Sequence, residues 1–396
     1  MNRVLGFFWT VVLARALGLE GFGEYTYLVA LVTLTSAFAE GGFTSIVSRD
    51  VARDPAQLQE MVPTAMGLTV IFNIAAALIT VAIALIDTPS RARFLHAGLV
   101  ALYLPSNGIF NVISAVFRGR DRFLYDSVFN IVQFVAFAVL SGVALLLGWG
   151  VTGVIAAFVV RQYLTAGASM ILCERRIGRV PIALRRPALR YLLREGLPLM
   201  LSGAAAQVYI RVDIIILSLA AGTTAVAIYS IASRFVDTLT TAASALGFAS
   251  LPLLATLFRA DPDHARQFIR RISWRVLLFS AIGSAVGIAV SPALIRSLYG
   301  APFAAAGHVL QILLLTIPIY AVSQLLSTVV VAEGRQKALV GVYGGATLLS
   351  IVLNALLAPQ LNYYGSALAG VATATSVGVA LLFVTRRLKG EETGHA

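Results

Sequence analysis

Cysteine and charged residues are both scarce in this chain. One of the 396 residues is a cysteine, Cys173, and 12% are charged, about half the share of an ordinary soluble domain. A single cysteine excludes a disulfide within the chain, and with four histidines it leaves no Cys/His cluster that has metal-ligand spacing. We therefore expect neither a metal ion nor any other cofactor.

Apolar residues are correspondingly abundant, at 59% of the chain, and the mean hydropathy is +0.87. A bilayer core about 30 Å thick needs about 20 apolar residues per helical crossing, and the sequence supplies such runs repeatedly with short breaks. It predicts an all-α integral membrane protein with about twelve transmembrane helices, the first of them short and apparently truncated. The expected spans are 1–17, 22–48, 62–86, 94–117, 126–147, 152–173, 195–220, 223–252, 273–297, 303–331, 339–358 and 363–385.

Lys and Arg residues gather in alternate loops. Positively charged flanks are retained on the cytoplasmic side during insertion, and a cytoplasmic N-terminus puts 23 of the 30 Lys and Arg residues on that side. Both termini are therefore expected in the cytoplasm, with an even number of crossings. Topology and attraction to anionic headgroups explain the net charge of +12, so we expect membrane lipids and no nucleic acid as partners.

The two halves of the chain resemble each other. VFRGRDRFL at 116–124 matches VAEGRQKAL at 331–339 at an offset of 215 residues. LARALGLEGFGEY at 13–25 matches LSLAAGTTAVAIY at 217–229 at an offset of 204, pairing Gly18 with Gly222 and Tyr25 with Tyr229. These matches predict two parallel six-helix halves, 1–190 and 191–396, as in transporters whose halves rock about a central site.

Three arginines lie well inside predicted spans, and a fourth, Arg15, lies at the outer end of the first span. An ionisable side chain in a span costs about 2.5 to 3.5 kcal/mol, so each is expected to face an interior cavity rather than lipid. Arginines that line a cavity favour an anionic substrate, so we predict substrate-binding roles for Arg15, Arg161, Arg211 and Arg234. The alternative is pairing with acids in the membrane, as Arg234 could with Asp237 three residues later.

Six segments resemble the polysaccharide-exporter and O-antigen flippase family, within the MATE-like multidrug, oligosaccharidyl-lipid and polysaccharide superfamily. They are VVLARALGLEGFGEY (11–25), FAEGGF (38–43), AVFRGRDRF (115–123), LGWGVTG (147–153), LPLMLSGAAAQVYIRVDIIILS (197–218) and AIYSIASR (227–234). The resemblance implies flipping of an undecaprenyl-diphosphate-linked oligosaccharide from the inner to the outer leaflet of a bacterial inner membrane. It implies alternating access around an arginine-bearing central cavity, for surface polysaccharide synthesis, with polymerase and chain-length proteins as candidate partners.

Three acidic residues are candidates for coupling transport to a proton or sodium ion. Asp213 stands where the resembling transporters often place an acid, and burial raises the pKa of a carboxyl group toward values that suit coupling. A salt bridge with an arginine is the competing interpretation of Asp213. Asp237 has the pairing alternative given above, and Glu40 lies close enough to the interface to line a wet cytoplasmic vestibule instead.

Two other functions compete with flipping. A MATE-like cation-coupled exporter of drugs or metabolites should have an acid-lined cavity, because its substrates are cationic. A polysaccharide polymerase or ligase in the membrane needs an outer loop with catalytic carboxylates, and the outer loops predicted here are short. We therefore expect a transporter without enzymatic activity.

Overall fold

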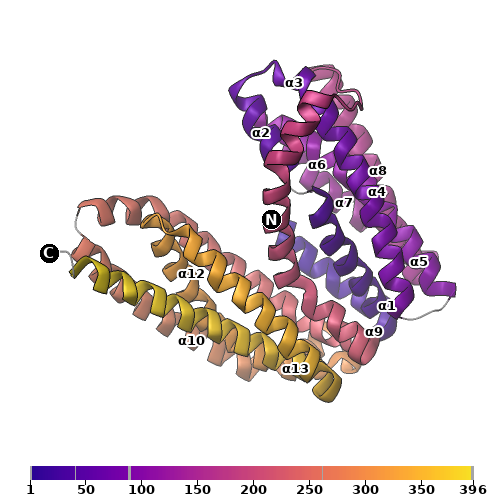
Figure 1. Cartoon of the computed structure of the whole chain (residues 1–396). Helices are drawn as coiled ribbons and strands as arrows, with labels where there is room; N and C mark the ends of the chain where they lie inside the picture. The colour runs from indigo at the N-terminus through magenta and orange to yellow at the C-terminus, as the bar shows by residue number, and fades with distance from the viewer. Residues whose placement is uncertain (1, 41, 88–90, 261, 394–396) are drawn as a thin grey trace. The chain divides into compact units, whose positions relative to one another are not determined.

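Helices make up almost all of the computed structural model, which describes residues 2–40, 42–87, 91–260 and 262–393 (Figure 1). The elements are α1 (Asn2–Glu40), α2 (Phe43–Arg53), α3 (Gln57–Glu60), α4 (Val62–Asp87), α5 (Arg91–Ala101), α6 (Tyr103–Gly119), α7 (Phe123–Leu146), α8 (Gly150–Arg176), α9 (Arg186–Ala260), α10 (Pro262–Tyr299), the 3-10 turn η1 (Ala301–Phe303), α11 (Ala305–Leu314), α12 (Thr316–Ala332) and α13 (Gln336–Thr393). Within the described ranges, nine segments are long and apolar enough to cross a membrane. The predicted all-helical membrane protein is confirmed.

Three of the longest helices contain a residue whose backbone is not helical. Gly18 interrupts α1 with φ 70° and ψ −176°, and Gly222 interrupts α9 with φ 77° and ψ 177°. Asn362 interrupts α13 with φ 52° and ψ −134°. Each break falls between two spans that the sequence predicts as separate.

The predicted second span, 22–48, is wrong at its end. The helix stops at Glu40, and a separate helix, α2, begins at Phe43. The buried residues of α2 recur every three or four positions and so form one face, namely Phe43, Ile46, Val47 and Val51. The stretch is therefore an amphipathic helix that packs against the protein rather than the end of a crossing.

The chain forms two compact units, and the first ends at Arg211 while the second begins at Val212. This boundary lies inside α9, because the start of that helix packs on the first unit: Leu192 is fully buried in the core formed by α2, α3, α4, α6, α7 and α8. The division at 190/191 was predicted from the repeat rather than from packing, and it stays a prediction about where the second repeat begins.

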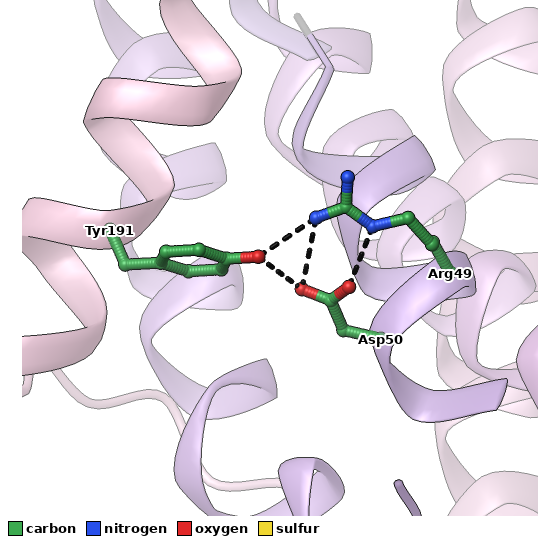
Figure 2. Close-up of polar contacts among 3 residues, drawn as sticks. All are labelled: Arg49, Asp50 and Tyr191. Carbon is green, nitrogen blue, oxygen red and sulfur yellow. Dashed lines mark hydrogen bonds and ion pairs between the residues drawn. The ribbon is translucent and has the colours of Figure 1, made fainter. Parts of the chain in front are cut away.

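In the first unit α1, α4, α6, α7 and α8 pack against one another, with α2 and α3 at one end and α5 at the other (Figure 1). The start of α9 is also held to α2 by polar contacts. The Tyr191 hydroxyl donates to Asp50 Oδ2 at 2.7 Å and accepts from Arg49 Nη2 at 2.8 Å, while Arg49 Nε donates to Asp50 Oδ1 at 2.7 Å (Figure 2). Partial burial alone would raise the pKa of Asp50, but the hydrogen bonds from Arg49 and Tyr191 outweigh it and lower that pKa.

Replacing Tyr191 with phenylalanine removes both of its hydrogen bonds and should lower the free energy of unfolding by about 0.5–1.5 kcal/mol. Thermal unfolding of the purified protein in detergent measures the change. Since the pKa of Asp50 is lowered, its stabilisation is present at neutral pH and is lost as the pH falls through that pKa, below the ordinary value of 3.8. The exposed Tyr163 on α8 gives a matched control, Tyr163→Phe. Equal melting temperatures of Tyr191→Phe and the wild type at pH 7 would contradict the prediction.

The second unit consists of the rest of α9 with α10 to α13, and these helices repeat features of the first unit. Gly18 and Gly222, paired by the sequence at an offset of 204, have nearly the same φ and ψ. The helix breaks at Leu102 and at Leu315 lie three residues before Pro105 and Pro318. Each proline lacks the N–H that would bond the carbonyl four residues earlier, and that carbonyl belongs to the last residue before the break.

The two repeats align differently from the sequence match at the turn between α6 and α7 and the turn between α12 and α13. Arg122 N bonds to Phe117 O at 2.8 Å, and Arg335 N bonds to Val330 O at 3.0 Å. The residue before each arginine, Asp121 or Gly334, has a positive φ. The turns therefore align at an offset of 213 rather than 215, which is also the offset between the two helix breaks.

Candidate functional site

Arg161 lies inside the first unit, on α8, among aromatic rings. Its guanidinium carbon is 4.5 Å from the ring centre of Phe158, one turn earlier on α8, and 5.2 Å from that of Phe137 on α7. A cation over an aromatic face is attracted by the negative charge of the ring face, by about 0.5–2 kcal/mol depending on solvation. The two rings therefore fix the guanidinium without neutralising it.

Two tyrosines extend this aromatic wall. Tyr103, the first residue of α6, stacks on Phe158 with ring centres 4.6 Å apart, and Tyr25 of α1 stacks on Phe137 at 6.3 Å. Phe137 and Phe158 themselves meet edge to face at 6.0 Å. Four helices thus contribute to the surroundings of Arg161.

The Nε atom of Arg161 is buried and has no hydrogen-bond partner among the described residues. Buried donors in proteins are nearly always bonded, and an exception calls for an explanation such as a ligand or an ion. Arg161 also forms no ion pair within the part of the chain that the structure describes. Its charge is therefore available to an anion.

Glu40 lies at the end of α1 in a chain of hydrogen bonds beside Arg161. It accepts from the side-chain amide of Asn107 on α6, whose oxygen accepts from Tyr103 at 2.8 Å and from Gln162 at 3.4 Å. Tyr103 lies within electrostatic reach of both Glu40 and Arg161. We call these five residues, Glu40, Tyr103, Asn107, Arg161 and Gln162, the polar cluster.

The second unit contains a neutral counterpart of the link between Glu40 and Asn107. The offsets of the repeat, 204 and 213, pair these residues with Ser244 and Tyr320. The hydroxyls of Ser244 and Tyr320 are hydrogen-bonded at 3.0 Å. A hydrogen bond between these two helices therefore does not require a charge, and of the two paired positions only Glu40 in the first unit carries a carboxylate.

The other predicted substrate-binding arginines lie in different surroundings. Arg15 is exposed, three residues before the break in α1, and Arg211 is partly buried at the end of the first unit. The Nε atom of Arg211 is, like that of Arg161, buried without a hydrogen-bond partner among the described residues. Arg234 in the second unit is exposed and lies within electrostatic reach of Tyr299. The structure thus leaves their joint role a prediction.

The predicted coupling acids of the second unit differ in burial. Asp213 is partly buried and accepts a hydrogen bond of 2.6 Å from the Tyr229 hydroxyl, across the break at Gly222. Asp237 is exposed, and its backbone carbonyl accepts from Thr240 and Thr241. Asp213 thus has an identified partner, and the pairing of Asp237 with Arg234 stays a prediction.

Sequence reasoning missed the two amides of the polar cluster. Asn107 and Gln162 lie in apolar runs, a signal that could have drawn attention to α6 and α8. It also missed His96 on α5, whose Nδ1 lies 2.7 Å from Glu24 Oε1 and whose Nε2 lies 2.7 Å from Thr152 Oγ1. These three residues tie α1, α5 and α8 together away from the polar cluster.

Several solved structures have a similar fold at low sequence identity. A lipid II flippase MurJ in an inward closed conformation matches with a TM-score of 0.79 at 14% identity, over 97% of this chain and 86% of its own. An inward-facing multidrug resistance MATE family transporter of the MOP superfamily matches at 0.77 and 16%, over 100% and 96%. A MOP superfamily transporter from Pyrococcus furiosus matches at 0.57 and 17%, over 98% and 91%. No curated protein matched.

Family profiles cover most of the chain between them. The polysaccharide biosynthesis protein profile matches residues 1–258, and the MatE profile matches residues 198–356. The first match spans more than half of the chain and includes α8 and the polar cluster. The chain therefore belongs to the polysaccharide biosynthesis protein family, and its fold is that of the MurJ and MATE transporter structures.

Proposed function

We propose that this transporter flips an undecaprenyl-diphosphate-linked oligosaccharide from the inner to the outer leaflet of a bacterial inner membrane. The observation that carries the proposal is the guanidinium of Arg161, held between Phe137 and Phe158 with a buried Nε that lacks a partner among the described residues. The membership of the polysaccharide biosynthesis family supports a glycan as the cargo.

The chemistry of the lipid head explains why an arginine would be kept at this place. A diphosphate carries about two negative charges, which must pass a medium where even one charged side chain costs about 2.5 to 3.5 kcal/mol. Arginine stays charged and binds phosphate oxygens through two parallel hydrogen bonds. Arg161 can supply this interaction without first breaking an ion pair.

We assign the remaining predicted residues as follows. Arg15, Arg211 and Arg234 serve as further contacts for the anionic substrate, and Glu40, Asp213 and Asp237 are the candidates for coupling to a proton or a sodium ion. We also propose twelve crossings, which result from dividing three of the nine apolar segments at Gly18, Gly222 and Asn362. The proposed topology places both termini in the cytoplasm, and the proposed mechanism is alternating access.

Reconstitution of the purified protein into vesicles tests this function. A polyprenyl-diphosphate oligosaccharide with a fluorescent sugar reports flipping, since the portion that reaches the outer leaflet becomes accessible to an added glycosidase. We expect the protein to accelerate this translocation over empty vesicles, and to leave the distribution of a lipophilic cationic dye unchanged. Transport of the dye without movement of the glycolipid would instead show that the protein is a drug exporter.

The same vesicles separate coupling from substrate binding. Under an imposed proton or sodium gradient the wild type should accelerate, while Glu40→Gln should flip at a rate independent of the gradient. Glutamine preserves the acceptor for Asn107, so the connection between α1 and α6 survives in the variant. A gradient response in Glu40→Gln equal to that of the wild type would move coupling to Asp213 or Asp237.

A further inference from the structure

The outer surface of α10 carries a cleft lined by Arg270, Arg271, Trp274 and Arg275. All four belong to one helix, and Arg270 with Trp274, like Arg271 with Arg275, are four residues apart and thus neighbours on its surface. Trp274 is 67% exposed, and the arginines are exposed as well. The cleft is therefore lined by three arginines and one tryptophan.

The charge of this cleft has no compensation along its own helix. Between Asp263 and Glu333 the sequence contains no Asp or Glu, so no acidic residue lies within one turn of the three arginines on their own helix. Arg271 and Arg275, four residues apart, carry like charges that repel each other. An anion bound between them would relieve this repulsion.

The position of the cleft along α10 coincides with the headgroup level of a bilayer. Residues 276–295, VLLFSAIGSAVGIAVSPALI, are twenty in number and uncharged, which is about the length that spans the hydrocarbon core. The arginines directly precede this stretch. Trp274 stands at the boundary, where tryptophan is enriched in membrane proteins because its ring is apolar and its N–H is polar.

A stripe of exposed apolar side chains runs from the cleft into the membrane-spanning part of α10. Its members recur every four residues and are Trp274, Leu278, Ile282, Val286 and Val290, with exposed fractions of 67%, 59%, 54%, 60% and 47%. At a spacing of four they follow one ridge of the helix. The cleft and the stripe together offer a place for a charged head and a surface for a hydrocarbon chain.

We propose that this surface binds an anionic phospholipid of the bilayer, with the phosphodiester among Arg270, Arg271 and Arg275 and an acyl chain along the stripe. The cleft is open and lies on the surface of a single helix, so it suits a ligand present at high concentration in the membrane rather than one that must be enclosed. A phosphodiester with one negative charge fits this site, which is separate from the polar cluster and belongs to the other unit.

Quenching of tryptophan fluorescence by brominated lipids tests the proposal on the full chain in bilayers. The signal of Trp274 is the difference between the wild type and Trp274→Phe. We expect brominated phosphatidylglycerol to quench it at lower mole fraction than brominated phosphatidylcholine, by about fivefold for each arginine that contacts the phosphate, and less so in high salt. Arg271→Ala with Arg275→Ala should remove most of the preference, and lysine at both positions should restore it.

The matched control is the double change of Arg175 and Arg176 to alanine, at the exposed end of α8, which should leave the preference intact. Three results would overturn the proposal: equal quenching by the two lipids, a preference that survives the alanine changes at Arg271 and Arg275, or its loss in the control. Displacement of the brominated phosphatidylglycerol by a small mole fraction of a polyprenyl diphosphate would also overturn it, by identifying the cleft as a docking place for the cargo.

Discussion

Replacing Arg161 with alanine should lower glycan export by about ten- to a hundredfold while the amount of protein in the membrane stays normal. Hydrogen bonds to charged groups contribute about 1.5–3 kcal/mol each, and the variant loses the guanidinium that would make them to the diphosphate. Folding should be little affected, because Arg161 forms no ion pair within the described residues and its aromatic neighbours also stack on one another. Complementation of a flippase-deficient strain, with immunoblotting of membranes, measures both quantities.

Three further variants make this experiment specific. Arg161→Lys keeps the charge but loses the planar fork, so it should export at an intermediate rate. Arg175→Ala removes an exposed arginine from the same helix and should export normally. Arg234→Ala should be impaired if the second unit contributes to binding, as proposed. Wild-type export by both Arg161→Ala and Arg234→Ala would refute the cationic binding mechanism.

Alanine at Gly18 or at Gly222 should destabilise the protein by about 1–3 kcal/mol. Both glycines combine a φ near +70° with a ψ near 180°, a region that is essentially closed to residues with a side chain. An added Cβ would have no atom within 4 Å at either position, so the cost arises from the backbone alone. Thermal unfolding in detergent should show the loss for each variant separately.

Two helical glycines provide the controls for this pair. Gly98 in α5 and Gly283 in α10 also have no atom within 4 Å of an added Cβ, but their backbones are helical. Alanine at these positions should be neutral, or stabilising by up to about 1 kcal/mol through its higher helix propensity. Equal behaviour of all four alanine variants would show that the two breaks are not under backbone constraint.

The sequence predicted the helices well because the membrane imposes a simple length and composition on them. It was wrong where an amphipathic helix follows directly on a span, since FTSIVS after Gly42 reads as a continuation of the apolar run. It also misaligned, by two residues, the turn between α6 and α7 with the turn between α12 and α13. The match paired Gly119 with Gly334, whereas the position with positive φ in the first unit is Asp121, a residue type that tolerates this conformation through its short polar side chain.

The candidate site could be predicted only in part for a similar reason. Arg161 is visible as a lone charge in an apolar run, and Glu40 as an acid near the end of one. Phe137 and Phe158 could not be recognised in the sequence, because aromatic residues are common in membrane helices. Their contact depends on the packing of α7 against α8. The amide chain from Asn107 to Gln162 likewise depends on the approach of α6 to α8.

The neutral pair of Ser244 and Tyr320 has a bearing on how such proteins diversify. Two copies of one ancestral segment would have begun with the same residues at these positions. The second unit shows that an uncharged hydrogen bond is enough to connect the two helices. Mechanical support and ion coupling can therefore diverge in evolution. A lineage can change the charge of one copy, and with it the coupling, while the other copy keeps the uncharged contact.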